Sequence, residues 1–413
     1  MHEPETPAAF LKRRAAGRIA AGHPWIYKGE IERIEGGAAT GCEIDVRDEG
    51  GRFVGRGIYN GASSISVRIF SRVEGEALDE AFLERRLRGA LRRRASLFGV
   101  RDVDPDNQQD LLRRLPETCR LVWSEADLCP GLVIDRYGDA CVIQTLSIGV
   151  ERWKGLLTDL LARRFGFRLV VERNDVPVRR REGLDQVKGI LTGDGPAVRR
   201  VRVGSAVMEI DLMEGQKTGA YLDQVESYGI IRDEAGGRRV LDAFCYQGAF
   251  AIHAALGGAE SVLAVDMSEE ALNAARRNAE INGVVSRITW KCANVFDFLH
   301  AAAKEGGTYD LIVLDPPSFT RSKDRVPEAV RGYKEINLRA LSMLREGGLL
   351  ATFCCSHHVD ADVFRGIALD AAFDAGKQLL LRRVFRQAPD HPILPAVPET
   401  EYLKGFLFEV MPD

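Results

Sequence analysis

The chain has 413 residues, of which 45% are hydrophobic and 28% charged, and its formal net charge is −3. This length predicts two or three domains, and the ordinary hydrophobic share excludes a largely disordered chain. No apolar run reaches the roughly 20 residues of a membrane helix, and the first residues lack the pattern of a secretory signal, so we expect a cytoplasmic protein.

The eight cysteines lack the short paired spacing of zinc sites and redox motifs. We therefore expect reduced thiols and no metal site. Most of the cysteines are expected to be buried as small hydrophobic residues. The adjacent Cys354 and Cys355 are an exception, because they end an apolar strand where reacting groups gather.

Short alternating runs broken by glycines, between Leu11 and Phe70, predict a small β-rich domain. Its start combines basic side chains with aromatic rings, a pattern that serves phosphate contact and base stacking. A core position in a barrel is the alternative for the tryptophan. The residues of this predicted RNA-binding strip are Lys12, Arg13, Arg14, Arg18, His23 and Trp25.

A helix is predicted between Glu80 and Arg101, because apolar residues recur along one side. Its other side is almost uniformly basic, with six arginines between Arg85 and Arg94 against Glu84 alone. Such a run is usually a solvated face, but contact with an anionic partner is the competing interpretation. A second basic cluster follows at residues 179–181.

The remainder alternates strands with helices. From about residue 118 to 190 the pattern is mixed, and after about Val207 short apolar strands alternate with amphipathic helices. That alternation predicts a doubly wound, mainly parallel α/β sheet, whose ligands bind at the carboxyl ends of the strands. We expect three domains, at residues 1–75, 76–195 and 196–413.

Polar residues follow four successive strands of the predicted sheet. They are Asp242, Asp266, Asn294 and Asp315. Asp266 follows Asp242 at about the separation expected of a second-strand carboxylate that binds ribose hydroxyls, and the Asn294 carbonyl is suited to an exocyclic amine. The series predicts a cofactor that contains adenosine, while the single glycine of the first loop disfavours a nicotinamide site.

These motifs resemble the class I S-adenosylmethionine-dependent methyltransferases, through the Asp315-Pro-Pro sequence that follows an apolar strand. More narrowly, the chain resembles the cytosine-C5 methyltransferases of large-subunit (23S) ribosomal RNA that carry an N-terminal PUA domain. The stretches that carry this resemblance are Lys217-Thr-Gly-Ala-Tyr-Leu-Asp-Gln224, Gly22-His-Pro-Trp-Ile-Tyr27, Gly131-Leu-Val-Ile-Asp-Arg-Tyr-Gly138, Arg331-Gly-Tyr-Lys334 and Tyr402-Leu-Lys-Gly-Phe406.

The resemblance implies a PUA RNA-binding domain, a small central α/β domain and a C-terminal Rossmann-like domain with a mostly parallel seven-stranded sheet. It implies S-adenosylmethionine as cofactor and ribosomal RNA as partner, and a homodimer is compatible with it. Asn294 stands where the family has aspartate. The implied cofactor-binding residues are Thr218, Gln224, Asp242, Phe244, Tyr246, Gly248, Asp266, Asn294 and Asp315.

Methylation of cytosine at C5 needs a nucleophile from the enzyme, because C5 by itself is too weak a nucleophile to attack a methyl group. A thiolate that adds to C6 makes C5 reactive, and an acid or base must assist at N3. Neighbouring residues of a strand point to opposite faces, so one of Cys354 and Cys355 is expected to face the cleft. The resemblance assigns the nucleophile to Cys355 and makes Asp315 its carboxylate partner. Core packing for both cysteines, and a turn role for Asp315, are the structural alternatives.

Two other functions are compatible with the sequence. Asp315-Pro-Pro followed by Phe319 also resembles motifs of enzymes that methylate exocyclic amines, which need no thiol. A non-catalytic RNA-binding protein of ribosome assembly is the alternative outside enzymes. The small net charge does not argue against RNA, because basic residues concentrate in particular segments while acidic residues serve the cofactor cleft.

Overall fold

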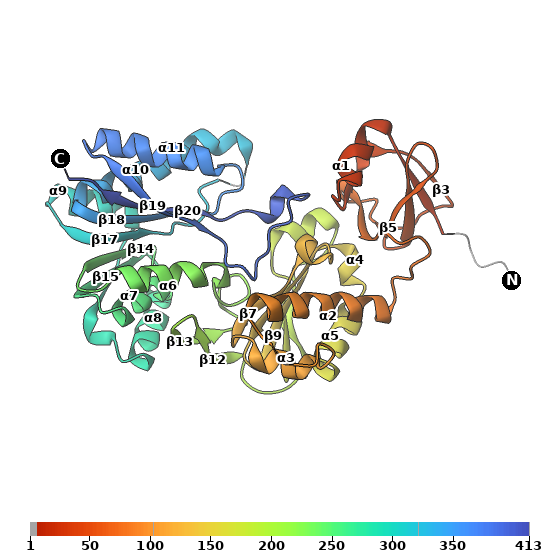
Figure 1. Cartoon of the computed structure of the whole chain (residues 1–413), viewed down its shortest axis with the longest axis horizontal. Coiled ribbons are helices and arrows are strands. Elements are labelled where there is room, and N and C mark those ends of the chain that lie inside the picture. The colour runs from red at the N-terminus through yellow and green to blue at the C-terminus, as the bar shows by residue number, and fades with distance from the viewer. Residues whose placement is uncertain (1–5, 102, 321, 413) are drawn as a thin grey trace. The chain divides into compact units, whose positions relative to one another are not determined.

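The computed structural model describes residues 6–101, 103–320 and 322–412 (Figure 1). The fold has two compact units. One comprises residues 1–201, 210–221 and 389–400, and the other comprises residues 202–209, 222–388 and 401–413. Within the described ranges no helix combines the length and the apolar character needed to cross a membrane.

The N-terminal part of the first unit is a six-stranded sheet in the order β2-β6-β5-β4-β1-β3. Its core is a separate apolar cluster that includes Ile26, Ile44 and Val67, so the expected β-rich domain is confirmed. The elements are β1 (Ala8–Leu11), α1 (Ala16–Ala20), β2 (Trp25–Tyr27), β3 (Ile31–Glu35), β4 (Glu43–Arg47), β5 (Phe53–Tyr59) and β6 (Ile65–Ser71), with 3-10 helices at Arg13–Ala15 and Lys28–Glu30.

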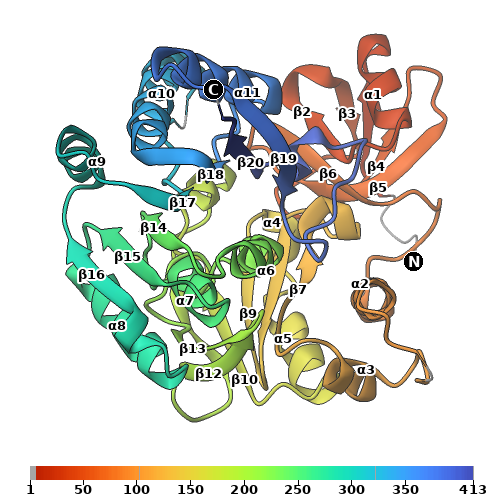
Figure 2. The same ribbon diagram turned by 60° about the vertical axis from the view of Figure 1, so that its left-hand side comes forward.

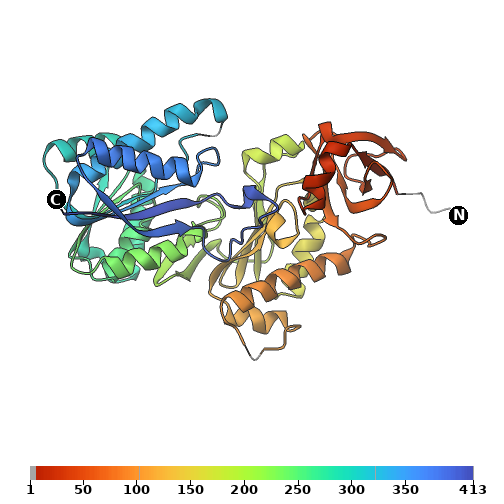
Figure 3. The same ribbon diagram turned by 45° about the horizontal axis from the view of Figure 1, so that its top comes forward.

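A five-stranded sheet in the order β11-β10-β9-β8-β7 follows, with α2 lying along one face (Figure 3). Asp79 caps α2 by accepting the Phe82 N–H, and the predicted apolar side of the helix is buried. The elements are α2 (Glu80–Leu97), α3 (Gln108–Arg114), β7 (Thr118–Trp123), β8 (Leu132–Tyr137), β9 (Ala140–Thr145), α4 (Ile148–Glu151), α5 (Lys154–Arg163), β10 (Leu169–Arg173) and β11 (Lys188–Thr192), with 3-10 helices at Ser124–Asp127 and Pro177–Glu182.

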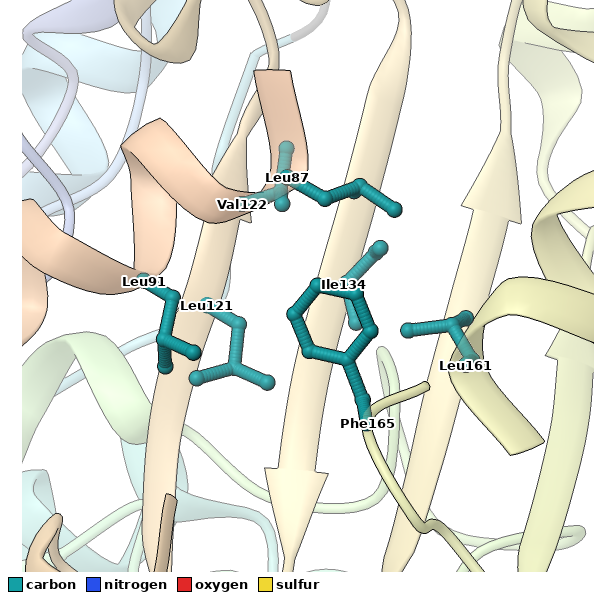
Figure 4. Close-up of a pocket in the computed structure, with 7 residues that line it drawn as sticks. All are labelled: Leu87, Leu91, Leu121, Val122, Ile134, Leu161 and Phe165. Atoms are coloured by element: carbon teal, nitrogen blue, oxygen red, sulfur yellow. The ribbon is translucent and has the colours of Figure 1, made fainter. Parts of the chain in front are cut away.

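A small cavity lies inside this second core. Its lining is entirely apolar, and we regard it as a packing gap because it presents no polar group to a ligand. The lining residues are Leu87, Leu91, Leu121, Val122, Ile134, Leu161 and Phe165 (Figure 4).

The chain passes between the units within β12 (Val198–Val203) and β13 (Ala206–Asp211), which pair with each other. The second unit is built on a seven-stranded sheet in the order β16-β15-β14-β17-β18-β20-β19. Strands β14 to β18 run parallel to one another, and β20 runs antiparallel to both β18 and β19. The expected mostly parallel seven-stranded sheet is therefore confirmed.

Helices cover both faces of this sheet, with α9, α10 and α11 on one side and α6, α7 and α8 on the other (Figure 2). The strands are β14 (Arg239–Ala243), β15 (Ser261–Asp266), β16 (Ile288–Cys292), β17 (Tyr309–Leu314), β18 (Leu344–Cys354), β19 (Leu379–Arg386) and β20 (Lys404–Val410). The helices are α6 (Val225–Glu234), α7 (Ala249–Leu256), α8 (Glu269–Ile281), α9 (Val295–Lys304), α10 (Val326–Met343) and α11 (Ala361–Asp374), with 3-10 helices at Leu222–Gln224, Val285–Arg287, Lys323–Arg325 and Pro398–Thr400.

Candidate active site

Three neighbouring parallel strands carry an aspartate at the carboxyl end. Asp242 lies in β14, Asp266 is the last residue of β15, and Asp315 follows β17, on the other side of β14. In an open α/β sheet this edge is where ligands bind. Asn294 follows β16, the neighbour of β15, so the sheet order places all four polar residues predicted at the strand ends along one edge.

Asp242 is almost completely buried, with 1% of its surface exposed. Its Oδ2 accepts the Ala251 N–H at 2.9 Å, whereas its Oδ1 has no hydrogen-bond partner among the described residues. Burial, together with the negative charges of Asp315 and Asp266, raises the pKa of Asp242 to about 8. A buried acceptor without a partner is costly, so this oxygen is suited to a ligand that brings a donor or a positive charge.

The loop after β14 has an unusual backbone. Phe244, Tyr246 and Gly248 all have positive φ angles, of 68°, 47° and 78°. A Cβ atom on Gly248 would lie 2.9 Å from the Trp290 ring and 3.0 Å from Ala275, so only glycine fits without displacement. This turn lets the backbone begin α7 directly at the sheet edge, which is how such loops approach a nucleotide closely.

Asp266 fixes that loop to the next strand. Its Oδ2 accepts the Tyr246 N–H at 2.8 Å and its Oδ1 accepts the Ser268 N–H at 2.9 Å. Each carboxylate oxygen has a second lone pair, so the side chain can still accept from a ligand hydroxyl.

Asn294 is exposed and caps α9, because its Oδ1 accepts the N–H groups of Phe296 and Asp297. The same oxygen was predicted to accept from an exocyclic amine. The local geometry gives it a structural task at the helix start, which an asparagine three residues before an aspartate also indicates in sequence.

Gln224 links the start of α6 to the Asp315 loop. Its Nε2 donates to Asp315 Oδ2 at 3.1 Å, and the side chain is almost fully buried. The Gln224 Oε1 atom, like Asp242 Oδ1, has no partner among the described residues. Two buried acceptors thus lack a donor at this edge of the sheet.

Thr218 has a different environment. It belongs to the first unit, where its Oγ1 donates to Asp135 Oδ2 at 2.6 Å and lies 3.2 Å from the Tyr137 hydroxyl. Its side chain is 1% exposed. The hydroxyl predicted to bind the cofactor therefore stabilises the buried carboxylate of Asp135, which lies in β8 of the five-stranded sheet.

The two adjacent cysteines lie in different environments, as the alternation along a strand predicts. Cys354 ends β18 with no exposed surface and packs in the apolar core. Cys355 is only partly buried, and its Sγ lies 4.0 Å from the carbonyl oxygen of Pro316, next to Asp315 in the chain. The pair therefore offers one sulfur that can reach a substrate.

Four residues around this sulfur were missed at the level of sequence. Ser356 and Ser318 directly follow the cysteine pair and the Asp315-Pro-Pro sequence, and Tyr333 and Lys404 come from α10 and β20. The two serines could have been noticed because each follows a predicted reacting group. Tyr333 and Lys404 lie far from the cysteines in sequence, in stretches whose only sequence signal is the family resemblance.

The predicted RNA-binding strip divides into exposed and engaged residues. The Arg13 side chain is 89% exposed, and Lys12, which is partly exposed, donates to the Gly29 carbonyl. Arg18 instead pairs with Glu30 at 2.7 Å. Arg14 lies in the 3-10 helix at Arg13–Ala15, and its side chain is outside the described part of the structure.

The two rings of the strip have interior partners. His23 is 3% exposed, and its Nδ1 accepts the Trp25 N–H. Trp25 is partly buried, and its Nε1 donates to Glu125 Oε1 at 2.8 Å. Both side chains thus stabilise the first unit itself.

Acidic neighbours engage most of the arginines of α2. Arg94 is buried and, with Arg93, donates to Asp127. Three more arginines of α2 form salt bridges: Arg85 with Glu76, Arg88 with Glu84, and Arg92 with Asp106. In the second basic cluster Arg179 is buried against Glu151, whereas Arg180 and Arg181 are exposed.

Comparison with known families covers most of the chain. Residues 10–72 match a PUA-like domain family, and residues 178–408 match a family of S-adenosylmethionine-dependent methyltransferases. Among curated proteins, "Ribosomal RNA large subunit methyltransferase I" of Klebsiella pneumoniae subsp. pneumoniae is 40% identical over 98% of both chains. The protein of the same name from Escherichia coli O139:H28 is 39% identical over 94% of this chain and 96% of its own.

Solved structures with the same fold have low sequence identity. A methyltransferase from Streptococcus mutans matches with a TM-score of 0.79 at 19% identity, over 98% of this chain and all of its own. The structure of SMU.776 complexed with SAH matches with a TM-score of 0.81 at 18% identity and the same coverage.

Proposed function

Because the chain belongs to the S-adenosylmethionine-dependent methyltransferases, and among them to the ribosomal RNA large subunit methyltransferase I family, we propose that it methylates carbon 5 of a cytosine in large-subunit rRNA. The observation that carries the cytosine-C5 assignment is the position of Cys355. This sulfur is partly exposed beside the Asp315 loop, while the adjacent Cys354 is sealed in the core.

The proposed reaction has three steps. The thiolate of Cys355 would form a bond to C6 of the base as the electrons of the C5–C6 double bond move to C5, and C5 would then bond to the methyl group as that group's bond to the sulfonium sulfur breaks and the neutral thioether leaves. A base would remove the proton from C5, and the electrons of that C–H bond would restore the double bond and expel the Cys355 thiolate. Asp315 accepts a hydrogen bond from the amino group of cytosine and, when protonated, donates one to N3.

S-adenosylmethionine supplies an electrophilic methyl group when bound, and the carboxyl edge of the sheet has the groups to hold it. The two partnerless buried acceptors, Asp242 Oδ1 and Gln224 Oε1, fit a ligand that carries an amino group and hydroxyls. Asp266 is suited to ribose hydroxyls. We propose these three residues as the core of the cofactor site, with the backbone of the 244–248 loop as its wall.

RNA is held by other parts of the chain. We propose that residues 1–75 and 76–195 act as separate domains, since each has its own sheet and its own main apolar cluster, with Ile58 and Phe70 of the first segment packing into the cluster of the second. Among the described side chains of the N-terminal strip, Arg13 is an exposed cation and Lys12 a partly exposed one, and Arg180 and Arg181 are exposed in the second cluster. Their charges would contact phosphates, which position the RNA without reading its sequence.

Bisulfite sequencing of rRNA from cells with and without the gene tests the reaction. A single cytosine of large-subunit rRNA is expected to lose its protection from conversion in the deletion strain and to regain it when the gene is restored. An unchanged protection pattern would contradict the proposal.

Methylation of an exocyclic amine would explain the Asp315-Pro-Pro motif without a thiol. In that chemistry an aromatic ring beside the motif would be needed to stack on the flipped-out target base. Here the Phe319 ring centroid lies 4.5 Å from that of Tyr333 and 5.6 Å from that of Phe296, so the ring already packs against two aromatic side chains. This packing favours the cysteine route. A non-catalytic RNA-binding role would require that S-adenosylmethionine does not bind, which calorimetry tests.

A further inference from the structure

Three hydroxyl groups form a hydrogen-bonded chain next to the proposed nucleophile. The Tyr333 hydroxyl, from α10, lies 2.9 Å from Ser356 Oγ, and Ser356 Oγ lies 2.9 Å from Ser318 Oγ. Ser318 in turn donates to the Thr320 carbonyl at 2.8 Å. Ser356 directly follows Cys355, and Ser318 stands three residues after Asp315, so the chain joins the two loops that carry the reacting groups.

The direction of the chain follows from counting protons. A hydroxyl has one proton, and that of Ser318 is used on the Thr320 carbonyl. Ser356 must therefore donate to Ser318, and Tyr333 must donate to Ser356. Burial is the main reason that the pKa of Tyr333 is raised, so its hydroxyl keeps its proton and remains a donor.

The backbone of Ser356 is held as well. Its carbonyl oxygen accepts from Lys404 Nζ at 2.8 Å, and Lys404 is the direct partner of Cys354 in the pairing of β18 with β20. Ser356 and Tyr333 have no exposed surface. Ser356 thus takes part in three polar contacts, which come from α10, from β20 and from the Asp315 loop.

We propose that Ser356 is a positioning residue, which holds Cys355 and Asp315 at the separation needed for methyl transfer by means of Tyr333 and Ser318. The proposal rests on the cytosine-C5 function above. Cys355 and Asp315 lie on loops that follow neighbouring strands, and the pairing of those strands ends before either residue. The hydroxyl chain spans the two loops beyond that point, where a displacement of about 1 Å can cost on the order of 100-fold in rate.

The alternative is a purely structural role, in which the three hydroxyls only complete one another's hydrogen bonds in the protein interior. Thr352 supplies the matched control, because it lies in β18 with no exposed surface and its Oγ1 has no hydrogen-bond partner among the described residues. Thr352→Val removes a buried hydroxyl from the strand that leads to Cys355 without touching the hydrogen-bonded chain of hydroxyls.

The test compares the purified variants S356A, Y333F, S356A/Y333F and T352V in single-turnover methylation of large-subunit rRNA. S356A and Y333F are expected to lower the rate roughly 10- to 100-fold, with the Kd values for RNA and S-adenosylmethionine within about twofold of wild type. The double variant is expected to be about as slow as S356A, because both changes break one chain. T352V is expected to retain the wild-type rate.

Rates of S356A and Y333F equal to that of T352V would overturn the proposal, and so would multiplicative losses in the double variant or losses confined to the Kd values. If S356A does not fold, Y333F alone decides between these outcomes. The variant C355A distinguishes a failure of the cytosine-C5 function from a failure of the positioning role. Full activity of C355A overturns the cytosine-C5 function and this inference together, whereas an inactive C355A with a normal Y333F overturns the positioning role only.

Discussion

The Oγ1 atom of Thr218 donates to Asp135 Oδ2 at 2.6 Å, inside a buried group in which Arg120 also binds both carboxylate oxygens of Asp135. Burial alone would raise the pKa of Asp135, but the Arg120 guanidinium and the Thr218 hydroxyl hold it below its usual value. This threonine, in one of the stretches that carry the family resemblance, therefore maintains the structure of the first unit.

Thr218→Val is expected to destabilise the protein by about 1.5–3 kcal/mol, the usual worth of a hydrogen bond to a buried charge. The Kd for S-adenosylmethionine is expected to stay within about twofold of wild type. Thermal unfolding and calorimetry measure the two quantities, and Thr218→Ser serves as a control that keeps the hydroxyl. A large loss of cofactor affinity with normal stability would instead show Thr218 to be a cofactor ligand.

Asp242 predicts an unusual dependence of stability on pH. Its pKa rises from 3.8 to about 8 on folding, so between those values the folded protein binds a proton that the unfolded chain releases. The cofactor-free protein is then expected to lose stability as the pH rises from about 4 to about 8. Asp242→Asn removes this loss, so its free energy of unfolding should fall less steeply over the same range.

The same substitution should act oppositely on cofactor binding. Asp242→Asn removes the charge that faces a cationic ligand, and we expect S-adenosylmethionine to bind roughly 10- to 100-fold more weakly. Wild-type binding near pH 7 should also release a proton, which calorimetry in buffers of different ionisation enthalpy detects. A stable D242N protein with unchanged affinity would remove Asp242 from the proposed cofactor site.

Gly248 tests the loop geometry. Gly248→Ala places a Cβ against Trp290 and Ala275 at a φ of 78°, whereas Gly258→Ala has a φ of 86° and open space around it. Both should lose about 1–2 kcal/mol to the backbone conformation, and Gly248→Ala about 1–3 kcal/mol more to overpacking. Only Gly248→Ala is expected to weaken cofactor binding. Equal effects of the two variants in thermal unfolding and calorimetry would contradict this account of the loop.

Substitutions of Arg13 and His23 distinguish a role in RNA binding from a role in stability within the N-terminal strip. Arg13→Ala removes an exposed cation and should lower the slope of log Kd for RNA against log salt by about 0.7–0.9, at unchanged thermal stability. His23→Ala instead removes a buried ring and should lower the melting temperature. Salt titrations of RNA binding together with thermal unfolding check both. An Arg13→Ala protein with an unaltered salt slope would exclude Arg13 from the interface.

The sequence was most informative where a short local pattern determines the structure. The alternation of a strand predicted that one of Cys354 and Cys355 is buried and the other faces the sheet edge, and the family resemblance chose Cys355. Apolar spacing was enough to identify the buried side of α2. The strand-helix alternation likewise predicted the α/β sheet whose carboxyl ends bring Asp242 and Asp315 together.

Pairings between distant segments could not be predicted in this way. The basic side of α2 suggested an anion contact, but Arg94 pairs with Asp127, about thirty residues further along, and no pattern in either segment indicates the other. The chain of Tyr333, Ser356 and Ser318 joins three segments that meet only because the sheet orders them. At Asn294 a local contact was missed instead. Its Oδ1, expected to accept from a ligand, accepts the Phe296 N–H and caps α9.

Methyl transfer by C355A tests the central claim most directly. Purified wild type, C355A and C354A are incubated with labelled S-adenosylmethionine and unmethylated large-subunit rRNA, and 5-methylcytosine is quantified by mass spectrometry after nuclease digestion. We predict that C355A binds the cofactor normally and forms no 5-methylcytosine, and that C354A stays within about tenfold of wild type with a lower melting temperature. A C355A protein that forms 5-methylcytosine at the wild-type rate would contradict the account.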